Sequence, residues 1–458
     1  MTLFRSVARN ISVLVASQAL MWVAAIVFTI AQATYLGPAR FGELSVALSY
    51  AGLLTFLIEF GLGTQLIRLV SQRASRHEEA FTAALLIKGA LWLLAMPCLF
   101  IVTLLFGYPR ELRETILLLA VSVLLIGTAQ TIGSYLQGRE RFFLPAAAAV
   151  AQRLSVAGVG VFMLLVRPEL TAVAAAFVVS GVVNLLVLVV GLRGLPSPIR
   201  IHLADVRQLF RRTVPLGLFG IATAVYWSVD MIMLQRLAPA ENVGWYAAAY
   251  RLFSVATLLP SVVAGIALSP VLSRLSVDSR PQLRAVIEKA VTFQTLAGVA
   301  AALMLALFAE RIIALVYPAH AYAGSAMALR LLAPGLLFIY VNWVFSQSLV
   351  SLHQERRLLI MAAVAAALNP LANLIAIPLF RENGAALTTS LTELLILVWL
   401  VRLMPRDLLS AANVRVATRA LLAAVATAIL LLPASGLELV VSMPLALAVF
   451  GGLAVMFR

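Results

Sequence analysis

Apolar stretches of about 20 residues, the length that spans the ~30 Å hydrocarbon core of a bilayer as a helix, alternate with short polar segments along the whole chain. The chain is therefore expected to be an all-α polytopic membrane protein with about fourteen transmembrane helices. The expected helices cover residues 10–35, 42–69, 80–106, 113–137, 143–166, 170–192, 213–236, 243–272, 286–309, 323–351, 357–379, 384–404, 414–432 and 438–457.

The composition agrees with a chain embedded in a membrane. Of the 458 residues, 63% are hydrophobic and only 12% are charged, and the mean hydropathy is +1.03. A soluble core cannot use this much apolar surface. One cysteine, Cys98, excludes a disulfide framework, and the four histidines show no spacing typical of a metal site. We therefore expect neither a metal nor an organic cofactor.

The basic residues indicate the orientation of the helices. If the N-terminus is cytoplasmic, the segments on the cytoplasmic side, counted with Lys88, contain 24 of the 34 lysines and arginines, and the opposite segments contain 7. Cytoplasmic loops carry this excess in multi-pass proteins. We therefore expect both termini in the cytoplasm, and we attribute the net charge of +15 to topology and contact with anionic membrane lipids rather than nucleic acid.

The order of helices and loops suggests two similar lobes. We expect six helices in residues 1–192, a basic cytoplasmic linker at 193–212, six helices in 213–405, and two additional transmembrane helices in 406–458. An internal repeat supports this division. Its members are residues 36–42 with 237–244, an offset near 200, and residues 136–141 with 352–357, an offset near 216.

The two lobes would then have the same orientation, as a parallel repeat about an axis along the membrane normal. Such lobes typically move against each other around a site near the midplane.

Three pairs of segments resemble a known family. The chain is similar to the polysaccharide-transport (Wzx-type oligosaccharide flippase) branch of the multidrug/oligosaccharidyl-lipid/polysaccharide (MOP) flippase superfamily, from residue 1 to about residue 405. The segments are 229–232 (VDMI) with 242–251 (NVGWYAAAYR), 369–378 (NPLANLIAIP) with 383–387 (NGAAL), and 36–42 (LGPARFG) with 59–62 (EFGL).

The resemblance implies a protein of the bacterial inner membrane that moves a polyprenyl-diphosphate-linked oligosaccharide from the cytoplasmic to the periplasmic leaflet. It implies alternating access between two six-helix lobes, coupled to a proton or sodium gradient. Surface polysaccharide synthesis, such as that of O-antigen or exopolysaccharide, would use this step, and a polysaccharide polymerase or chain-length machinery would be its partner.

Three arginines inside the expected helices suit an anionic lipid substrate. They are Arg153, Arg251 and Arg330, and we expect all three near the midplane. A guanidinium can bind phosphate oxygens with two parallel hydrogen bonds. Arg251 has an alternative, because it could pair with Asp230, and both contacts could occur at different stages of transport.

Two acidic residues, Asp230 and Glu393, are also expected within the membrane. A protonatable carboxylate there is what ion coupling requires, and the alternative is a permanently ionised partner of an arginine. Glu59 is expected near the cytoplasmic interface in a structural role. Trp92, Trp245 and Tyr246 are expected as packing or interface aromatics.

Other functions remain open from the sequence. A drug or metabolite antiporter of the same superfamily is the nearest alternative, although three midplane arginines favour an anionic substrate. A flippase for the peptidoglycan lipid precursor differs little in physics. A membrane-embedded glycan polymerase or ligase would need a larger outer loop or an acid and base at the membrane surface, so we do not expect an enzyme.

Overall fold

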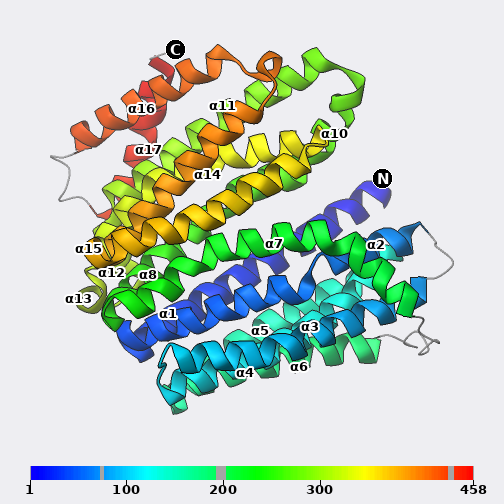
Figure 1. Ribbon diagram of the computed structural model, residues 1–458. Helices are drawn as coiled ribbons and strands as arrows, with labels where there is room; N and C mark the ends of the chain where they lie inside the picture. Colours follow the sequence, from blue (N-terminus) through cyan, green and yellow to red (C-terminus); the bar gives the residue numbers. More distant parts are fainter. Residues whose placement is uncertain (1, 73–76, 192–202, 432–437, 457–458) are drawn as a thin grey trace. The chain divides into compact units, whose positions relative to one another are not determined.

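The computed structural model describes residues 2–72, 77–191, 203–431 and 438–456, and these contain helices and turns without a β-strand. The helices are α1 (Thr2–Glu59), α2 (Leu62–Ser71), α3 (His77–Leu105), α4 (Arg110–Gly138), α5 (Phe143–Val166), α6 (Leu170–Gly191), α7 (Leu203–Leu237), α8 (Ala240–Ala256), α9 (Leu258–Val262), the π-helix η1 (Val263–Leu268), α10 (Ser269–Asp278), α11 (Arg280–Leu307), α12 (Ala309–Val316), α13 (Ala319–Tyr322), α14 (Ser325–Ser351), α15 (Glu355–Leu403), the 3₁₀-helix η2 (Arg406–Leu408), α16 (Ala411–Leu431) and α17 (Leu439–Met456) (Figure 1).

Twelve of the helical stretches in the described residues are long and apolar enough to span a membrane. Two of them, Val23–Ser71 and Glu355–Leu403, have 49 residues each, which corresponds to about 74 Å of helix. That is more than twice the ~30 Å hydrocarbon core. The first bends at Gly37 (φ 70°, ψ 172°) and the second at Arg381 (φ 52°, ψ −129°). Each is therefore a hairpin that crosses twice, and the predicted fourteen crossings are confirmed.

The chain divides into two compact units, residues Met1–Ser228 and Val229–Arg458. The division lies within α7, and α7 already begins at Leu203. The basic linker expected at 193–212 is thus helical in its second half, and residues 193–202 lie outside the described residues.

Within the first unit, α4 and α5 each pack along α6, and α1 packs against both α4 and α5. Large side chains from several helices pack together in shared cores. One such core contains Leu66, Phe81, Tyr135, Leu136 and Leu188 from α2, α3, α4 and α6.

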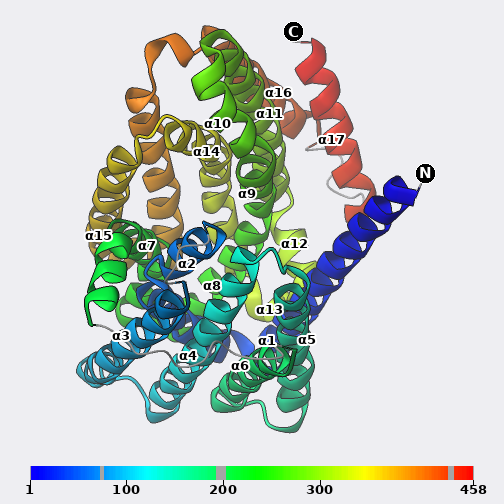
Figure 2. The same cartoon turned by 90° about the vertical axis from the view of Figure 1, so that its right-hand side faces the viewer.

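Within the second unit, α14 is central and packs against α8, α11 and α15. The C-terminal helices α16 and α17 pack against each other, and α16 lies along α11 (Figures 1 and 2). Their shared core includes Val299, Leu303, Ala423 and Phe450. The additional helix pair is therefore attached to α11 of the second unit.

Helices α4 and α14, which the internal repeat pairs, end in the same way. In α4, the amide of Arg141 donates to Leu136 O at 2.9 Å, and Glu140 has a φ of 63°. In α14, the amide of Gln354 donates to Leu349 O at 2.9 Å, and His353 has a φ of 57°. Both are the 6→1 bond of a Schellman C-cap with a left-handed residue. Residues 140 and 353 hold the same place in these two caps, 213 residues apart, and the expected offset of 216 stays a prediction.

Candidate functional site

A buried carboxylate in the second unit is held by side chains from three helices. Asp230 of α7 is 3% exposed. It accepts a short hydrogen bond from the Tyr246 hydroxyl of α8 and one from Thr389 Oγ1 of α15 at 3.3 Å. The amide of Met231 also donates to Asp230 Oδ1 at 3.1 Å. Asp230 therefore joins α7, α8 and α15 through polar bonds in an apolar interior.

The ends of the α7–α8 hairpin explain why Asp230 meets Tyr246 rather than Arg251. Helix α7 ends at Leu237 and α8 begins at Ala240. Asp230 and Tyr246 therefore lie about 10 Å and 9 Å from their helix ends, whereas Arg251 lies about 16 Å from the start of α8. The sequence places both Asp230 and Arg251 inside the membrane and offers the two as a pair. In the described residues Arg251 is not among the partners of Asp230.

Glu393, the second predicted carboxylate, lies one helical turn beyond Thr389 in α15. Glu393 is 5% exposed and follows Thr389 by four residues, so the two side chains lie on one face of the helix. Asn342 of α14 donates its amide to Glu393 Oε2 at 2.8 Å and to Glu393 O at 3.1 Å. Tyr250 of α8 interacts electrostatically with both Asp230 and Glu393. The two carboxylates thus belong to one buried polar layer.

Two asparagines of α15 extend this polar layer. Asn369 donates to Thr392 Oγ1 at 3.3 Å, and Asn373 donates to Asn369 Oδ1 at 3.0 Å. Among the described residues, Asn342 Oδ1 and Asn373 Oδ1 are buried acceptors without a hydrogen-bond partner. A buried polar atom without a partner is costly. The layer therefore has capacity to accept hydrogen bonds from water or to coordinate a cation.

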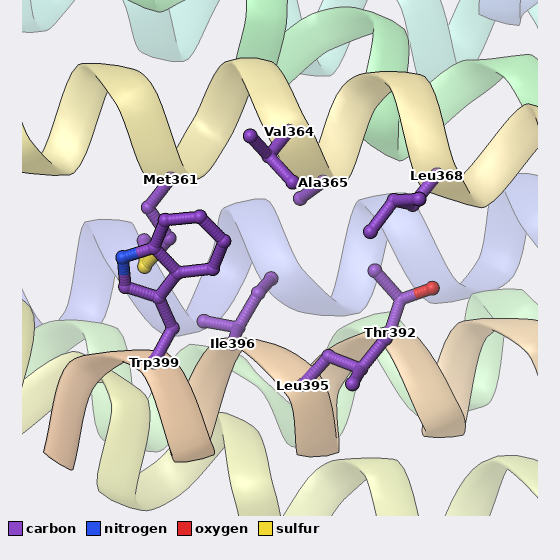
Figure 3. Close-up of a pocket in the computed structure, with 8 residues that line it drawn as sticks. All are labelled: Met361, Val364, Ala365, Leu368, Thr392, Leu395, Ile396 and Trp399. Carbon is purple, nitrogen blue, oxygen red and sulfur yellow. The ribbon is translucent and has the colours of Figure 1, made fainter. Parts of the chain in front are cut away.

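An apolar pocket opens beside this layer between the two arms of α15. Met361, Val364, Ala365 and Leu368 point into it from the first arm (Figure 3). Four residues of the second arm, Thr392, Leu395, Ile396 and Trp399, face them (Figure 3). Thr392 supplies the pocket's hydroxyl group and also bonds to Asn369. Apart from the Thr392 hydroxyl, apolar side chains line the pocket.

Arg251 is partly buried in α8 and has a tyrosine neighbour. Tyr317, which follows α12, interacts electrostatically with the Arg251 guanidinium. Burial raises the pKa of Tyr317 to about 12, although the nearby guanidinium acts in the opposite direction. Tyr317 therefore stays protonated at neutral pH and donates to Ala248 O at 3.2 Å. Arg251 lies deep in the hairpin and remains a candidate for contact with an anion.

The other two predicted arginines have different surroundings. Arg330 lies five residues from the start of α14, or about 8 Å, so it is nearer the end of the helix than predicted. Its Nη2 pairs with Glu310 Oε1 at 3.0 Å, a partner that the sequence did not indicate. Arg153 lies near the middle of α5 with an exposed side chain. Arg153 belongs to the first unit, and Arg251 and Arg330 belong to the second.

Two contacts of charged side chains were not predicted from the sequence. Tyr246 was expected to serve in packing or at the interface, but it bonds to Asp230. Lys88 was counted with the cytoplasmic segments, but it lies inside α3 and pairs with Glu59 at 2.5 Å. The mirrored positions of Asp230 and Tyr246 about the α7–α8 turn were a signal that could have revealed the first contact.

Within residues 2–72, 77–191, 203–431 and 438–456, no group of three or more histidine, cysteine or carboxylate side chains is placed to hold a metal ion.

Comparison with known proteins identifies the family. The model of a family described as polysaccharide biosynthesis protein matches residues 7–276, which is more than half of the chain. The chain belongs to this family. A second family model, MatE, matches residues 215–375. The predicted membership of the MOP flippase superfamily is thereby confirmed.

One curated relative of the chain is named a probable low-salt glycan biosynthesis flippase, Agl15, from Haloferax volcanii. It is 23% identical over 359 residues, which are 78% of this chain and 75% of the relative. Among solved structures, the lipid II flippase MurJ in an inward closed conformation has a TM-score of 0.77 at 14% identity and covers 96% of this chain and 97% of its own.

A multidrug resistance MATE family transporter in an inward-facing conformation has a TM-score of 0.65 at 15% identity, with 82% of this chain and 92% of its own covered. These two likenesses show a shared fold. The relatives are named as flippases and transporters rather than as enzymes.

Proposed function

We propose that this polysaccharide biosynthesis protein flips a polyprenyl-diphosphate-linked oligosaccharide across the bacterial inner membrane for surface polysaccharide synthesis. The family match and the glycan flippase relative support this proposal. The structural observation that carries it is the polar layer around Asp230 and Glu393, buried among helices that are long enough to span a membrane. Ionisable residues at such depth typically mark a transport pathway.

Transport is driven, in this proposal, by an ion that binds at Asp230 and Glu393. Asp230 accepts three hydrogen bonds and joins α7, α8 and α15. Binding of H⁺ or Na⁺ changes the charge at this junction and so favours a different arrangement of the three helices. The unpartnered oxygens of Asn342 and Asn373 are compatible with a cation in the same layer.

The diphosphate is bound, in this proposal, by arginines. Arg251 is the principal candidate because it lies within the hairpin that carries Asp230 and Tyr246. Arg153 is a second candidate, since its side chain is exposed midway along α5. Arg330 is the weakest of the three, because Glu310 already neutralises it. The N- and C-termini are cytoplasmic, and a polysaccharide polymerase or chain-length protein receives the flipped product.

Complementation tests this function. A host that lacks its own oligosaccharide flippase should regain surface glycan when it expresses the wild-type protein. At equal membrane abundance, Arg251→Gln and Asp230→Asn should restore less than a tenth of that glycan, and Arg330→Gln should restore more than either. Arg110→Gln is the control, because Arg110 forms an exposed pair with Glu114. Lipid-linked oligosaccharide that stays on the cytoplasmic face in all strains would contradict the proposal for that glycan.

A second candidate function is export of a drug or metabolite. The MatE match over residues 215–375 favours it. Reconstituted protein that exchanges an organic cation for H⁺ or Na⁺, without flipping lipid, would support this alternative.

A further inference from the structure

A lysine is buried in the first unit, outside the polar layer of the second unit. Lys88 lies eleven residues into α3, is 1% exposed, and donates to Glu59 Oε2 at 2.5 Å and to Gly127 O of α4 at 2.9 Å. A lysine at this depth costs on the order of 3 kcal/mol or more. Replacing a buried ion pair by apolar side chains is often neutral or stabilising. The pair is therefore weak evidence of a role in stability.

Glu59 lies where a membrane helix is interrupted. Helix α1 ends at Glu59, Phe60 and Gly61 have φ values of 41° and 73°, and α2 begins at Leu62. The amide of Gly63 in the first turn of α2 donates to Glu59 Oε1 at 3.0 Å. A Cβ atom at residue 63 would lie 2.5 Å from this oxygen, so glycine provides the space that the carboxylate uses.

Two positive groups thus converge on one carboxylate. The Lys88 ammonium contacts Glu59 Oε2, and the amide end of α2 contacts Glu59 Oε1. A helix N-terminus beside a lysine is an arrangement that binds phosphate in other proteins. Here the anion is the chain's own glutamate.

The pair can be reached from one side. The Glu59 side chain is 31% exposed, whereas that of Lys88 is 2% exposed. If Glu59 rotated away, Lys88 would keep its bond to Gly127 O and would stay in position. An anion that approached from the side of Glu59 could then contact the ammonium.

We propose that Lys88 and the amide end of α2 form an anion-exchange site, in which a phosphate oxygen of the lipid-linked diphosphate replaces the Glu59 carboxylate. This inference rests on the proposed flippase function for its ligand. The exchange breaks and forms only hydrogen bonds and ion pairs. Glu59 acts as an internal competitor that occupies the site whenever substrate is absent.

If Glu59 is an internal competitor, substitutions of Glu59 and of Lys88 should change the affinity for the diphosphate in opposite directions. With purified full-length protein in nanodiscs, Glu59→Gln should bind undecaprenyl diphosphate about tenfold more tightly, because it loses the competing charge, and Lys88→Gln should bind it at least tenfold more weakly. Both should transport poorly. Glu114→Gln, which removes a carboxylate from an exposed pair, is the matched control and should bind like wild type.

A purely structural pair would give a different result. If Glu59→Gln and Lys88→Gln both weaken binding, or if neither changes it, the proposal is wrong. If Lys88→Gln does not fold, Glu59→Gln still decides, since damage to the protein does not tighten binding.

Two further probes identify the anion and separate this site from the flippase function. Phosphatidylglycerol that competes as well as undecaprenyl diphosphate would overturn the assignment to the diphosphate. Inorganic pyrophosphate tests the site without a lipid. If Glu59→Gln tightens pyrophosphate binding in a protein that fails complementation, the anion site stands and the flippase function fails. If the wild type complements but Glu59→Gln tightens neither probe, only the anion site fails.

Discussion

The Tyr246 hydroxyl donates a hydrogen bond to Asp230 from the opposite arm of the α7–α8 hairpin. The two residues meet because they lie at nearly equal depth, seven residues before the end of α7 and six after the start of α8. Thr389 adds the third helix, α15. A change in the charge of Asp230 therefore alters contacts among three helices at once.

Removal of the Tyr246 hydroxyl should weaken both the fold and transport. Tyr246→Phe leaves a buried carboxylate with one donor fewer, which costs about 1.5–3 kcal/mol. Thermal unfolding of the purified protein measures this loss. Tyr35→Phe is the control, because Tyr35 is 47% exposed on α1. The change should be smaller when Asp230→Asn is already present, because the two residues act as a pair. Strictly additive effects would contradict the contact.

The Asn342–Glu393 bond should contribute measurably to stability. Asn342→Ala removes the amide that donates to Glu393 Oε2 at 2.8 Å. It leaves a carboxylate that is 5% exposed without this donor. We expect a loss of about 1–3 kcal/mol in the free energy of unfolding. A loss within experimental error in unfolding measurements would show that water replaces the asparagine.

Gly384 should tolerate no side chain at the turn of α15. A Cβ atom there would lie 2.1 Å from Ala376 O in the other arm. Gly384→Ala should therefore force the hairpin apart and lower stability by about 1–3 kcal/mol or more. Gly158→Ala is a matched control, since a Cβ atom at residue 158 meets nothing within 4 Å. Equal behaviour of the two variants in thermal unfolding would disagree with the tight hairpin.

The turns that follow α4 in the first unit and α14 in the second unit should face the same compartment. In a Cys98→Ser background, single cysteines at positions 140 and 353 should react only with reagents on the cytoplasmic side, and one at position 240 only with reagents outside the cell. This expectation follows from the positive-inside rule and the matching C-caps. Labelling of residues 140 and 353 from opposite sides would rule out a parallel repeat.

The sequence predicted the helices well, because apolar runs of spanning length leave few alternatives in a membrane. It also identified Asp230 and Glu393 as buried acids, because each interrupts an apolar run. The partners were harder to predict. The sequence offered Arg251 as a possible partner of Asp230, but the helix ends at Leu237 and Ala240 place Tyr246 at the matching depth.

Contacts between distant helices were not predictable from spacing alone. Arg330 and Glu310 are separated by 20 residues, and Lys88 and Glu59 by 29. Neither pair shares a helix, so the periodicity of each helix carries no information about its partner. The interruption at Phe60 and Gly61 was also hidden, because the surrounding residues read as one apolar stretch.

Flipping in proteoliposomes under an imposed ion gradient tests the central claim most directly. The substrate is a fluorescent polyprenyl-diphosphate-linked oligosaccharide, and the rate is measured for wild type and Asp230→Asn with a H⁺ gradient, with a Na⁺ gradient and with none. We expect one gradient to accelerate the wild type at least tenfold and to have no effect on Asp230→Asn. A wild-type rate that is the same under all three conditions, or an Asp230→Asn variant that responds like wild type, would contradict ion-coupled flipping through this polar layer.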